Sequence, residues 1–267
     1  MNHLRAELAP VSDAAWKEIN GEATRTLSNF LAARRLVEFE GPLGWDHAAV
    51  TTGRRAEVPS IVDGVDASTR IVRPVIELRT EFVLDRAELD SIDRGAEDAD
   101  LYPLVDAARR AALGEDRLVF GGSSSANVTG IATGSPHATL PIGDDYANFP
   151  GLVASAVSTL RDAGVDGPYA VALGPRCYTG VIETTERGGY PVLEHLRLIT
   201  GGPVVYAPAV DGTLVISQRG GDFRLTVGQD FSIGYLDHDR SSVTLYMEES
   251  LTFTNSTPEA AIALTYG

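Results

Sequence analysis

The chain has 267 residues, of which 43% are hydrophobic and 22% charged, as in globular proteins of one large domain or two lobes. Its formal net charge of −15 argues against binding of nucleic acid or an anionic membrane, because both need clustered lysine and arginine. The single cysteine, Cys177, excludes an intrachain disulfide, which fits a reducing compartment. The sequence shows neither the apolar core of a signal peptide nor an apolar run of about 20 residues that could span a membrane. We therefore expect a soluble, cytoplasmic protein.

The first predicted element is an amphipathic helix from about Ser12 to Arg34. Ser12 is the expected N-cap, and Asp13 lies in the first turn, where a negative charge is favourable. Apolar residues recur every three or four positions and form one stripe: Trp16, Ile19, Ala23, Leu27, Phe30 and Leu31. A helix with such a stripe needs a surface to pack on, and we expect it to dock on the β-meander near the C-terminus.

A β-rich region follows, from Arg35 to Leu84. A short strand is predicted at Val37 and Phe39, then a turn at 41–44, and then segments with strand character around 48–52, 68–72 and 75–83. The middle of the region has many charges and few large apolar side chains. The pattern predicts an extended β-arm whose tip is not buried within one monomer, although an ordinary surface hairpin fits it equally well.

Helices and a second lobe follow the arm. Asp85 starts a short helix in capping-box fashion with Glu88, and a longer helix is predicted from Pro103 to Phe120. Residues 123–148 have the composition of a loop. Beyond them, helices at 152–163, 175–186 and 191–198 are predicted to alternate with strands at 169–173, 204–207 and 213–217, so we interpret 123–218 as a second lobe.

Three alternating runs between Arg219 and Thr254 predict an antiparallel meander with one covered face. A polar turn at 237–242 separates the second run from the third. Glu249 is the exception, since it falls on the apolar face of the third run. A buried carboxylate needs a cationic partner, and we expect Arg34 or Arg35, at the end of the first helix, to provide it.

The sequence contains no pattern that indicates catalysis or cofactor binding. Nucleophile-elbow, phosphate-loop, dinucleotide-binding and zinc-protease motifs are all missing. The five histidines are scattered along the chain, and Cys177 has no nearby histidine. A packing role for the cysteine and a flexible loop at Ser123–Ser125 are the better interpretations. We therefore expect no catalytic residues, no metal site, no cofactor and no enzymatic activity.

Several short strings together resemble the encapsulins, the linocin-type family of bacterial nanocompartment shell proteins. They are LRAELAPV at Leu4–Val11, AWKEI at Ala15–Ile19, GPLGW at Gly41–Trp45, ELDSIDRG at Glu88–Gly95, GVDGPY at Gly164–Tyr169, RGGDF at Arg219–Phe223, GQDFSIGY at Gly228–Tyr235 and ESLTF at Glu249–Phe253. The resemblance extends almost from end to end of the chain, and the order and spacing of the strings make it specific.

The resemblance implies an α+β fold of the tailed-phage major-capsid-protein (Hong Kong 97) type. In that fold, residues 1–44 would form the N-terminal helix and the start of the P-domain. Residues 45–80 would form the extended E-loop arm, 81–122 the P-domain with its spine helix, and 123–218 the A-domain. Residues 219–267 would form the meander that closes the P-domain. The exposed arm would then lie along a neighbouring subunit.

The resemblance also implies a function, which is self-assembly into an icosahedral shell, by default of sixty copies, around a cargo enzyme. The cargo would be a dye-decolourising peroxidase or a ferritin-like protein held by its C-terminal peptide. The implied peptide-binding residues are Phe30, Arg34, Val37, Ile233, Tyr235, Leu245 and Met247. The implied five-fold pore loop comprises Glu186, Arg187, Gly188, Gly189 and Tyr190.

Two further points separate this chain from its relatives and from other functions. Some family members bind flavin through a tryptophan in the short helix, and this chain has Ala87 there, so we expect no flavin. A bacteriocin-type or proteolytic protein is the alternative, and a monomeric α+β ligand-binding protein is a third possibility. No nucleic acid or membrane partner is expected.

Overall fold

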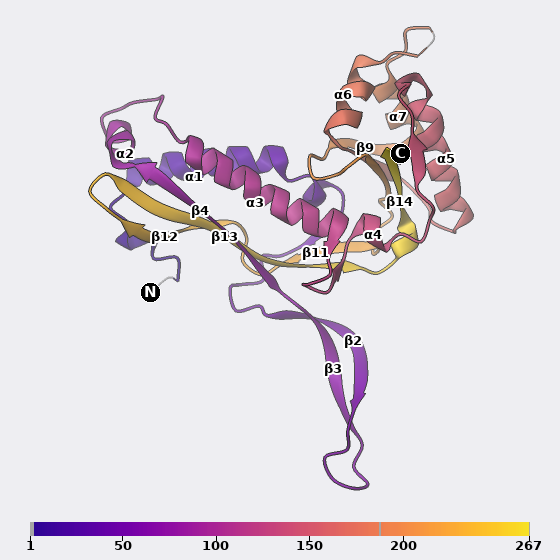
Figure 1. Cartoon of the computed structure of the whole chain (residues 1–267), viewed down its shortest axis with the longest axis horizontal. Coiled ribbons are helices and arrows are strands. Elements are labelled where there is room, and N and C mark those ends of the chain that lie inside the picture. The colour runs from indigo at the N-terminus through magenta and orange to yellow at the C-terminus, as the bar shows by residue number, and fades with distance from the viewer. Residues whose placement is uncertain (1–2, 187, 267) are drawn as a thin grey trace.

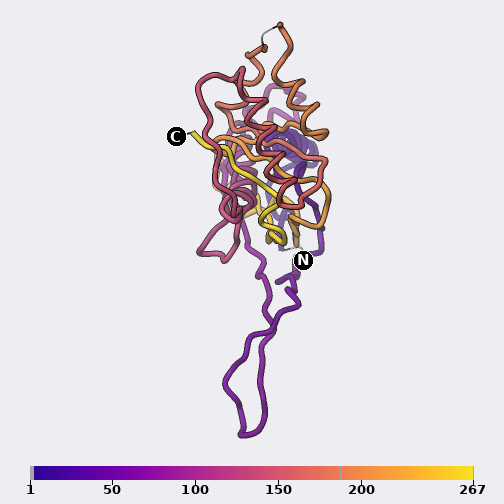
Figure 2. Tube along the Cα trace, turned by 90° about the vertical axis from the view of Figure 1, so that its right-hand side faces the viewer, coloured from indigo at the N-terminus to yellow at the C-terminus, as the bar shows by residue number. Residues whose placement is uncertain are grey.

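A computed structural model describes residues 3–186 and 188–266. It has an elongated part with a long helix over a sheet, a second lobe at one end, and an arm that projects away from both (Figure 1). Figure 2, turned by 90°, shows that the arm extends well beyond the rest of the chain. The mixture of helices and largely antiparallel sheets is of the α+β class, as predicted.

The elongated part is organised by β13 (Ser242–Asn255), the longest strand. Along one edge it pairs with β4 (Ile76–Asp85). Along the other it pairs with β12 (Ser232–His238) and then with β11 (Phe223–Val227), which also pairs in parallel with β1 (Glu38–Glu40). The three alternating runs of the sequence are β11, β12 and β13, and their antiparallel pairing is confirmed. The simple meander order is wrong, because β11 and β12 both pair with β13 and not with each other.

Helix α3 (Tyr102–Gly121) covers this sheet, and α1 (Asp13–Phe30) packs beside α3 (Figure 1). The expectation that the first helix docks directly on the meander is therefore wrong in its main part. Small residues of α3, among them Ala107 and Ala108, allow α1 to approach closely, and Ile19 of α1 lies fully buried in the same cluster. Helix α2 (Arg86–Asp93) lies at the end of β4.

The first helix also ends earlier than predicted, at Phe30, and is followed by a 3-10 turn at Ala33–Arg35. Its beginning agrees with the sequence, because the Ser12 hydroxyl accepts a hydrogen bond from the Ala15 N–H at 3.1 Å. At the other end the buried Asp116 carboxylate accepts hydrogen bonds from the Ala32 and Ala33 N–H groups, at 3.0 and 2.9 Å. Those bonds hold the chain in a non-helical path.

The second lobe contains a five-stranded sheet in the order β7 (Leu140–Ile142), β14 (Ala261–Tyr266), β10 (Thr213–Ser217), β8 (Tyr169–Leu173) and β9 (Gly201–Tyr206). Helices α5 (Phe149–Asp162), α6 (Pro175–Glu183) and α7 (Val192–Thr200) pack around it. The segment predicted as a loop also contains the short β5 (Gly122–Ser123), β6 (Val128–Thr129) and α4 (Ile131–Gly134).

The arm consists of β2 (Ala49–Val58) and β3 (Ala67–Pro74), which pair with each other. None of the described residues in these two strands is buried. An isolated two-stranded ribbon is marginally stable in water. The arm therefore needs support from outside its own chain.

Two of the domain boundaries drawn from the sequence need correction. The arm was expected to extend to residue 80, but β4 begins at Ile76 and its register with β13 continues from Leu251↔Ile76 to Ser242↔Asp85, so this segment belongs to the main sheet. The closing unit was expected to include everything from 219 to 267. Strand β14 instead inserts between β7 and β10 of the second lobe.

Candidate functional site

The buried polar centre of the elongated part is the side chain of Arg34. Its Nη2 lies 2.7 Å from Glu115 Oε2, 2.9 Å from Asp230 Oδ1 and 2.5 Å from Glu249 Oε1. The pair with Glu249, expected because that carboxylate lies on the apolar face of the meander, is confirmed. The rings of Phe39 and Phe231 flank the guanidinium, with centroids 5.0 and 5.3 Å from its central carbon.

The sequence does not predict that two carboxylates on α3, those of Glu115 and Asp116, belong to this centre. They are adjacent and both fully buried. They continue, at a spacing of four residues, the buried side of α3 that carries Ala107, Ala108, Ala111 and Ala112, but two adjacent acidic residues on a helix are almost always exposed unless they are paired. The centre thus holds three buried carboxylates, those of Glu115, Asp116 and Glu249, near one partly buried guanidinium.

This excess of negative charge changes how the groups bind protons. Burial raises the pKa of Asp116 to about 7, although the Ala33 and Ala32 N–H groups oppose the shift. Burial, reinforced by the charge of Glu115, also raises the pKa of Glu249 above its usual range, against the effect of Arg34. Burial lowers the pKa of Arg34, but its bonds to Glu115 and Asp230 outweigh that effect and raise it overall. Arg34 therefore stays charged, while Asp116 and Glu249, with their raised pKa values, bind protons more readily than exposed carboxylates do.

The raised pKa of Asp116 predicts that the folded chain loses stability as the pH rises. Its pKa is raised in the folded chain from 3.8 to about 7, so the folded state binds more protons than the unfolded state in that window. The contribution of Asp116 to the free energy of unfolding is then greatest below about pH 4 and falls as the pH rises to about 7, by a few kcal/mol at about 1.4 kcal/mol per pKa unit.

The measurement is urea unfolding of the wild type and of Asp116→Asn between pH 4.5 and 8, with Asp106→Asn, on the exposed face of the same helix, as the control. We expect the difference in free energy between wild type and Asp116→Asn to change from pH 4.5 to about pH 7 and to level off above it. A difference that is the same at every pH would contradict the prediction.

The residues implied for peptide binding do not converge on a single pocket. Leu245 and Met247 are buried in the core beneath α3, at 0% and 1% exposure, so their availability to a peptide is contradicted. Their side chains share the face of β13 that packs against the helix. Ile233, opposite Met247 in the register, is 9% exposed and reaches the edge of this core.

The remaining predicted residues lie apart from one another. Phe30 packs under the guanidinium of Arg109, with 5.1 Å between that carbon and the ring centroid. Val37 lines a small hollow of about 130 Å³ beside Gln218. The Tyr235 hydroxyl bonds His238 Nδ1 at 2.5 Å. Arg34 is occupied by its carboxylates.

A larger hollow of about 500 Å³ lies between the N-terminal segment, α1 and β12. Its apolar wall is formed by Ala9, Val11, Trp16 and Ile233, and Glu7 and Asp13 lie at its rim. Of the predicted peptide-binding residues, Ile233 alone contributes to this wall. Val11 and Trp16 could have been found from the sequence, since both stand in the strings that carry the family resemblance.

The predicted pore loop joins α6 to α7 at the outer end of the second lobe (Figure 1). It is closed by hydrogen bonds from Glu186 N–H to Tyr190 O at 2.8 Å and from Gly189 N–H to Glu186 O at 2.9 Å. Gly189 has φ +82°, a conformation that a side chain would strain. The Glu186 carboxylate also pairs with His195 Nδ1 at 2.7 Å. Arg187 lies outside the described residues.

Other kinds of site have little support in residues 3–186 and 188–266. No three side chains among His, Cys, Asp and Glu come together in a way that could hold a metal ion. Cys177 is buried, and its Sγ lies 2.9 Å from the Tyr266 hydroxyl. Within the same residues, no helix combines the length and apolar character needed to cross a membrane.

Comparisons with known proteins match almost the whole chain to one kind of protein. The family model described as "Encapsulating protein for peroxidase" matches residues 1–252. A type 1 encapsulin shell protein of Rhodospirillum rubrum is 52% identical over 99% of this chain and 96% of its own length. One of Mycobacterium tuberculosis is 44% identical over the full length of both chains.

Solved structures show the same fold at low sequence identity. A virus-like particle protein from Pyrococcus furiosus matches with a TM-score of 0.67 at 17% identity, covering 93% of this chain and 98% of that one. The capsid protein of the Myoviridae phage XM1 matches with a TM-score of 0.57 at 13% identity, over 86% and 90%. The expectation of a phage-capsid fold is confirmed.

Proposed function

The chain belongs to the family of encapsulating proteins for peroxidase, the type 1 encapsulins, and on this premise we propose that it assembles into a closed icosahedral shell. The observation that carries the proposal is the arm. Its tip exposes Ile61 by 84%, Val62 by 63% and Val65 by 54%, and an apolar patch at the end of a projecting hairpin is typical of an interaction site.

The arm supports a closed assembly because its contact joins two different surfaces. A projecting hairpin that packs on another copy makes a head-to-tail contact, and such contacts generate rings when the rotation between copies closes. Its strands also present backbone groups that a neighbouring chain can cover. We propose sixty copies per shell, located in the bacterial cytoplasm, with loop 186–190 lining the pore at the five-fold axis.

We further propose that the shell encloses a cargo enzyme, a peroxidase or a ferritin-like protein, through the C-terminal peptide of that enzyme. The name of the matched family supports a peroxidase. The proposed binding surface is the hollow of about 500 Å³ walled by Val11, Trp16 and Ile233. An extended apolar peptide binds by placing alternate side chains in such a trough. Phe30, Val37 and Tyr235 lie outside this hollow and are proposed as separate contacts of the cargo.

Negative-stain microscopy and size-exclusion chromatography of the purified chain test the shell. We expect uniform hollow particles in the megadalton range. A species of the size of one chain, 28.4 kDa, as the main component under native conditions would contradict the proposal.

Cargo loading is tested with fluorescent proteins that carry the C-terminal tails of candidate peroxidase and ferritin-like cargo proteins. Val11→Asp and Ile233→Asp place a charge in the apolar wall, so we expect at least tenfold less fluorescence in purified particles. Val83→Asp, at an exposed position of β4, is the matched control. Equal loading in all three variants would refute this location for the peptide.

A further inference from the structure

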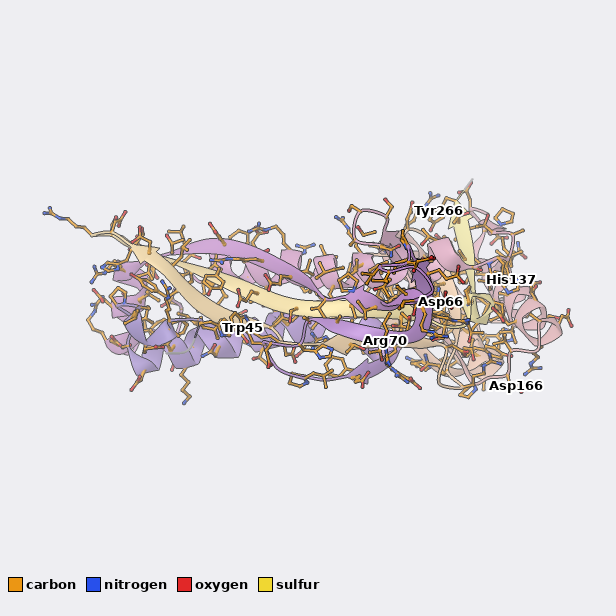
Figure 3. The ribbon with its side chains drawn as sticks, turned by 90° about the horizontal axis from the view of Figure 1, so that it is seen from below. Trp45, Asp66, Arg70, His137, Asp166 and Tyr266 are labelled. Atoms are coloured by element: carbon orange, nitrogen blue, oxygen red, sulfur yellow. The ribbon has the colours of Figure 1, made fainter. Side chains whose placement is uncertain are left out.

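Three arginines surround a hollow on the arm. Arg54 and Arg55 come from β2 and Arg70 from β3, and all three line a space of about 390 Å³ (Figure 3, where Arg70 is labelled). Its other lining residues are uncharged, so no carboxylate of the chain faces these guanidinium groups inside the hollow. The three side chains are exposed.

The hollow is built by an irregularity in the hairpin. The register between β2 and β3 shifts between Thr51 and Arg55, and Gly53 adopts φ +70°, which favours glycine. The Thr52 hydroxyl fixes the local path, because it donates to the Ile71 carbonyl at 2.6 Å and accepts from the Arg54 N–H at 3.2 Å. Consecutive residues of a regular strand point to opposite faces, and the bulge brings both Arg54 and Arg55 to the same space.

The arrangement is unfavourable within one chain. Arg55 and Arg70 are direct cross-strand partners, and like charges directly opposite each other destabilise a hairpin. Elsewhere in the chain, arginines such as Arg176 and Arg219 have carboxylate partners, Asp144 and Asp222. Across residues 3–186 and 188–266, the guanidinium groups of the arm cluster form no ion pair.

We propose that this arginine cluster binds carboxylate side chains of a second copy of the chain. The arm projects away from its own fold (Figure 2), so the partner is another molecule. The chain itself supplies the complementary charge, with 37 acidic against 22 basic residues. Its segment 85–100 alone contains seven carboxylates and two arginines. Guanidinium groups bind carboxylates in a bidentate geometry that suits such a contact.

This inference rests on the proposed shell and gives the arginine cluster a specific role in its assembly. The apolar tip supplies contact area, whereas the arginine cluster makes the contact selective for an acidic surface and therefore sensitive to salt. A free anion, such as phosphate or sulfate, would satisfy the same three guanidinium groups. The experiments below separate the two sources.

Zero-length cross-linking identifies the partner directly. Lys17 is the only lysine in the chain, so Arg70→Lys adds one amine at the hollow and keeps its charge. Particles assembled from a mixture of unlabelled and ¹⁵N-labelled chains are treated with a water-soluble carbodiimide and digested for mass spectrometry. We expect mixed-label cross-links between the introduced lysine and an aspartate or glutamate. Cross-links to its own chain alone, or none from this position, would overturn the inference.

Charge reversal measures the contribution of the cluster. In a low-salt chloride buffer without phosphate or sulfate, we expect wild type to assemble and Arg55→Glu/Arg70→Glu to lose at least tenfold in assembled fraction. Arg117→Glu/Arg240→Glu, at two exposed positions off the arm, makes the same change in net charge and is the control. Wild-type assembly that requires added phosphate, or an equal loss in the control, would overturn the inference. Wild type that forms no particle in any buffer would instead contradict the proposed shell.

Discussion

Replacing residues 53–70 with a two-residue Asn-Gly turn is expected to abolish particle formation and leave a folded, monomeric chain. Thr52 and Ile71 are already bridged by a hydrogen bond of 2.6 Å, so a two-residue turn can join them. None of the deleted residues belongs to either hydrophobic core cluster. The deletion therefore removes intersubunit contacts and leaves intrachain packing in place.

Light scattering coupled to size-exclusion chromatography measures the mass, and near-ultraviolet circular dichroism reports the packing of the core. Thr69→Ser, an exposed change on the same arm, is the control and should assemble like the wild type. Particles of wild-type size from the shortened chain would show that the arm is dispensable. Loss of the dichroism signal together with loss of assembly would show that the arm also supports the fold.

Arg34→Met is expected to lower the free energy of unfolding by about 3–5 kcal/mol, the usual result of removing one partner from a buried ion pair. Methionine fills part of the same volume, so the loss comes mainly from leaving Glu115 and Glu249 without a cation. Both carboxylates are essentially inaccessible to water, and a buried charge without a partner is strongly destabilising.

The neighbouring Arg35→Met is the matched control, because Arg35 is exposed and its replacement should change stability by about 0.5 kcal/mol or less. Urea unfolding followed by tryptophan fluorescence measures both variants. The double variant Arg34→Met/Glu249→Met should recover part of the loss, since one unpaired carboxylate is removed with its partner. Equal stabilities for Arg34→Met and Arg35→Met would disprove the role of Arg34.

Much of the elongated part follows from local sequence patterns. Period-two alternation locates β11, β12 and β13, and the single misfit, Glu249, leads to its partner Arg34 across more than two hundred residues. That inference works because a charge on an otherwise apolar face has very few ways to be satisfied. The Ser12 cap and the exposed arm follow from equally local signals.

The parts that the sequence does not predict depend on contacts between distant segments. Strand β14 has the apolar character of a buried strand, but nothing local indicates that it leaves the meander for the second lobe. Asp116 has the appearance of a solvated helix residue until α1 ends against it. Leu245 and Met247 illustrate the same limit, because alternation identifies an apolar face without showing what covers it.

The position of β14 also has a consequence for synthesis of the chain. This strand completes the second lobe by pairing with β7 and β10, so the lobe can close only after residue 266 has left the ribosome. The arm emerges almost two hundred residues earlier, roughly 10 to 40 s at about 5–20 residues per second. Throughout that interval the nascent chain exposes the arm while its second lobe is still incomplete. Translation therefore sets the earliest time at which a fully folded subunit can join its neighbours.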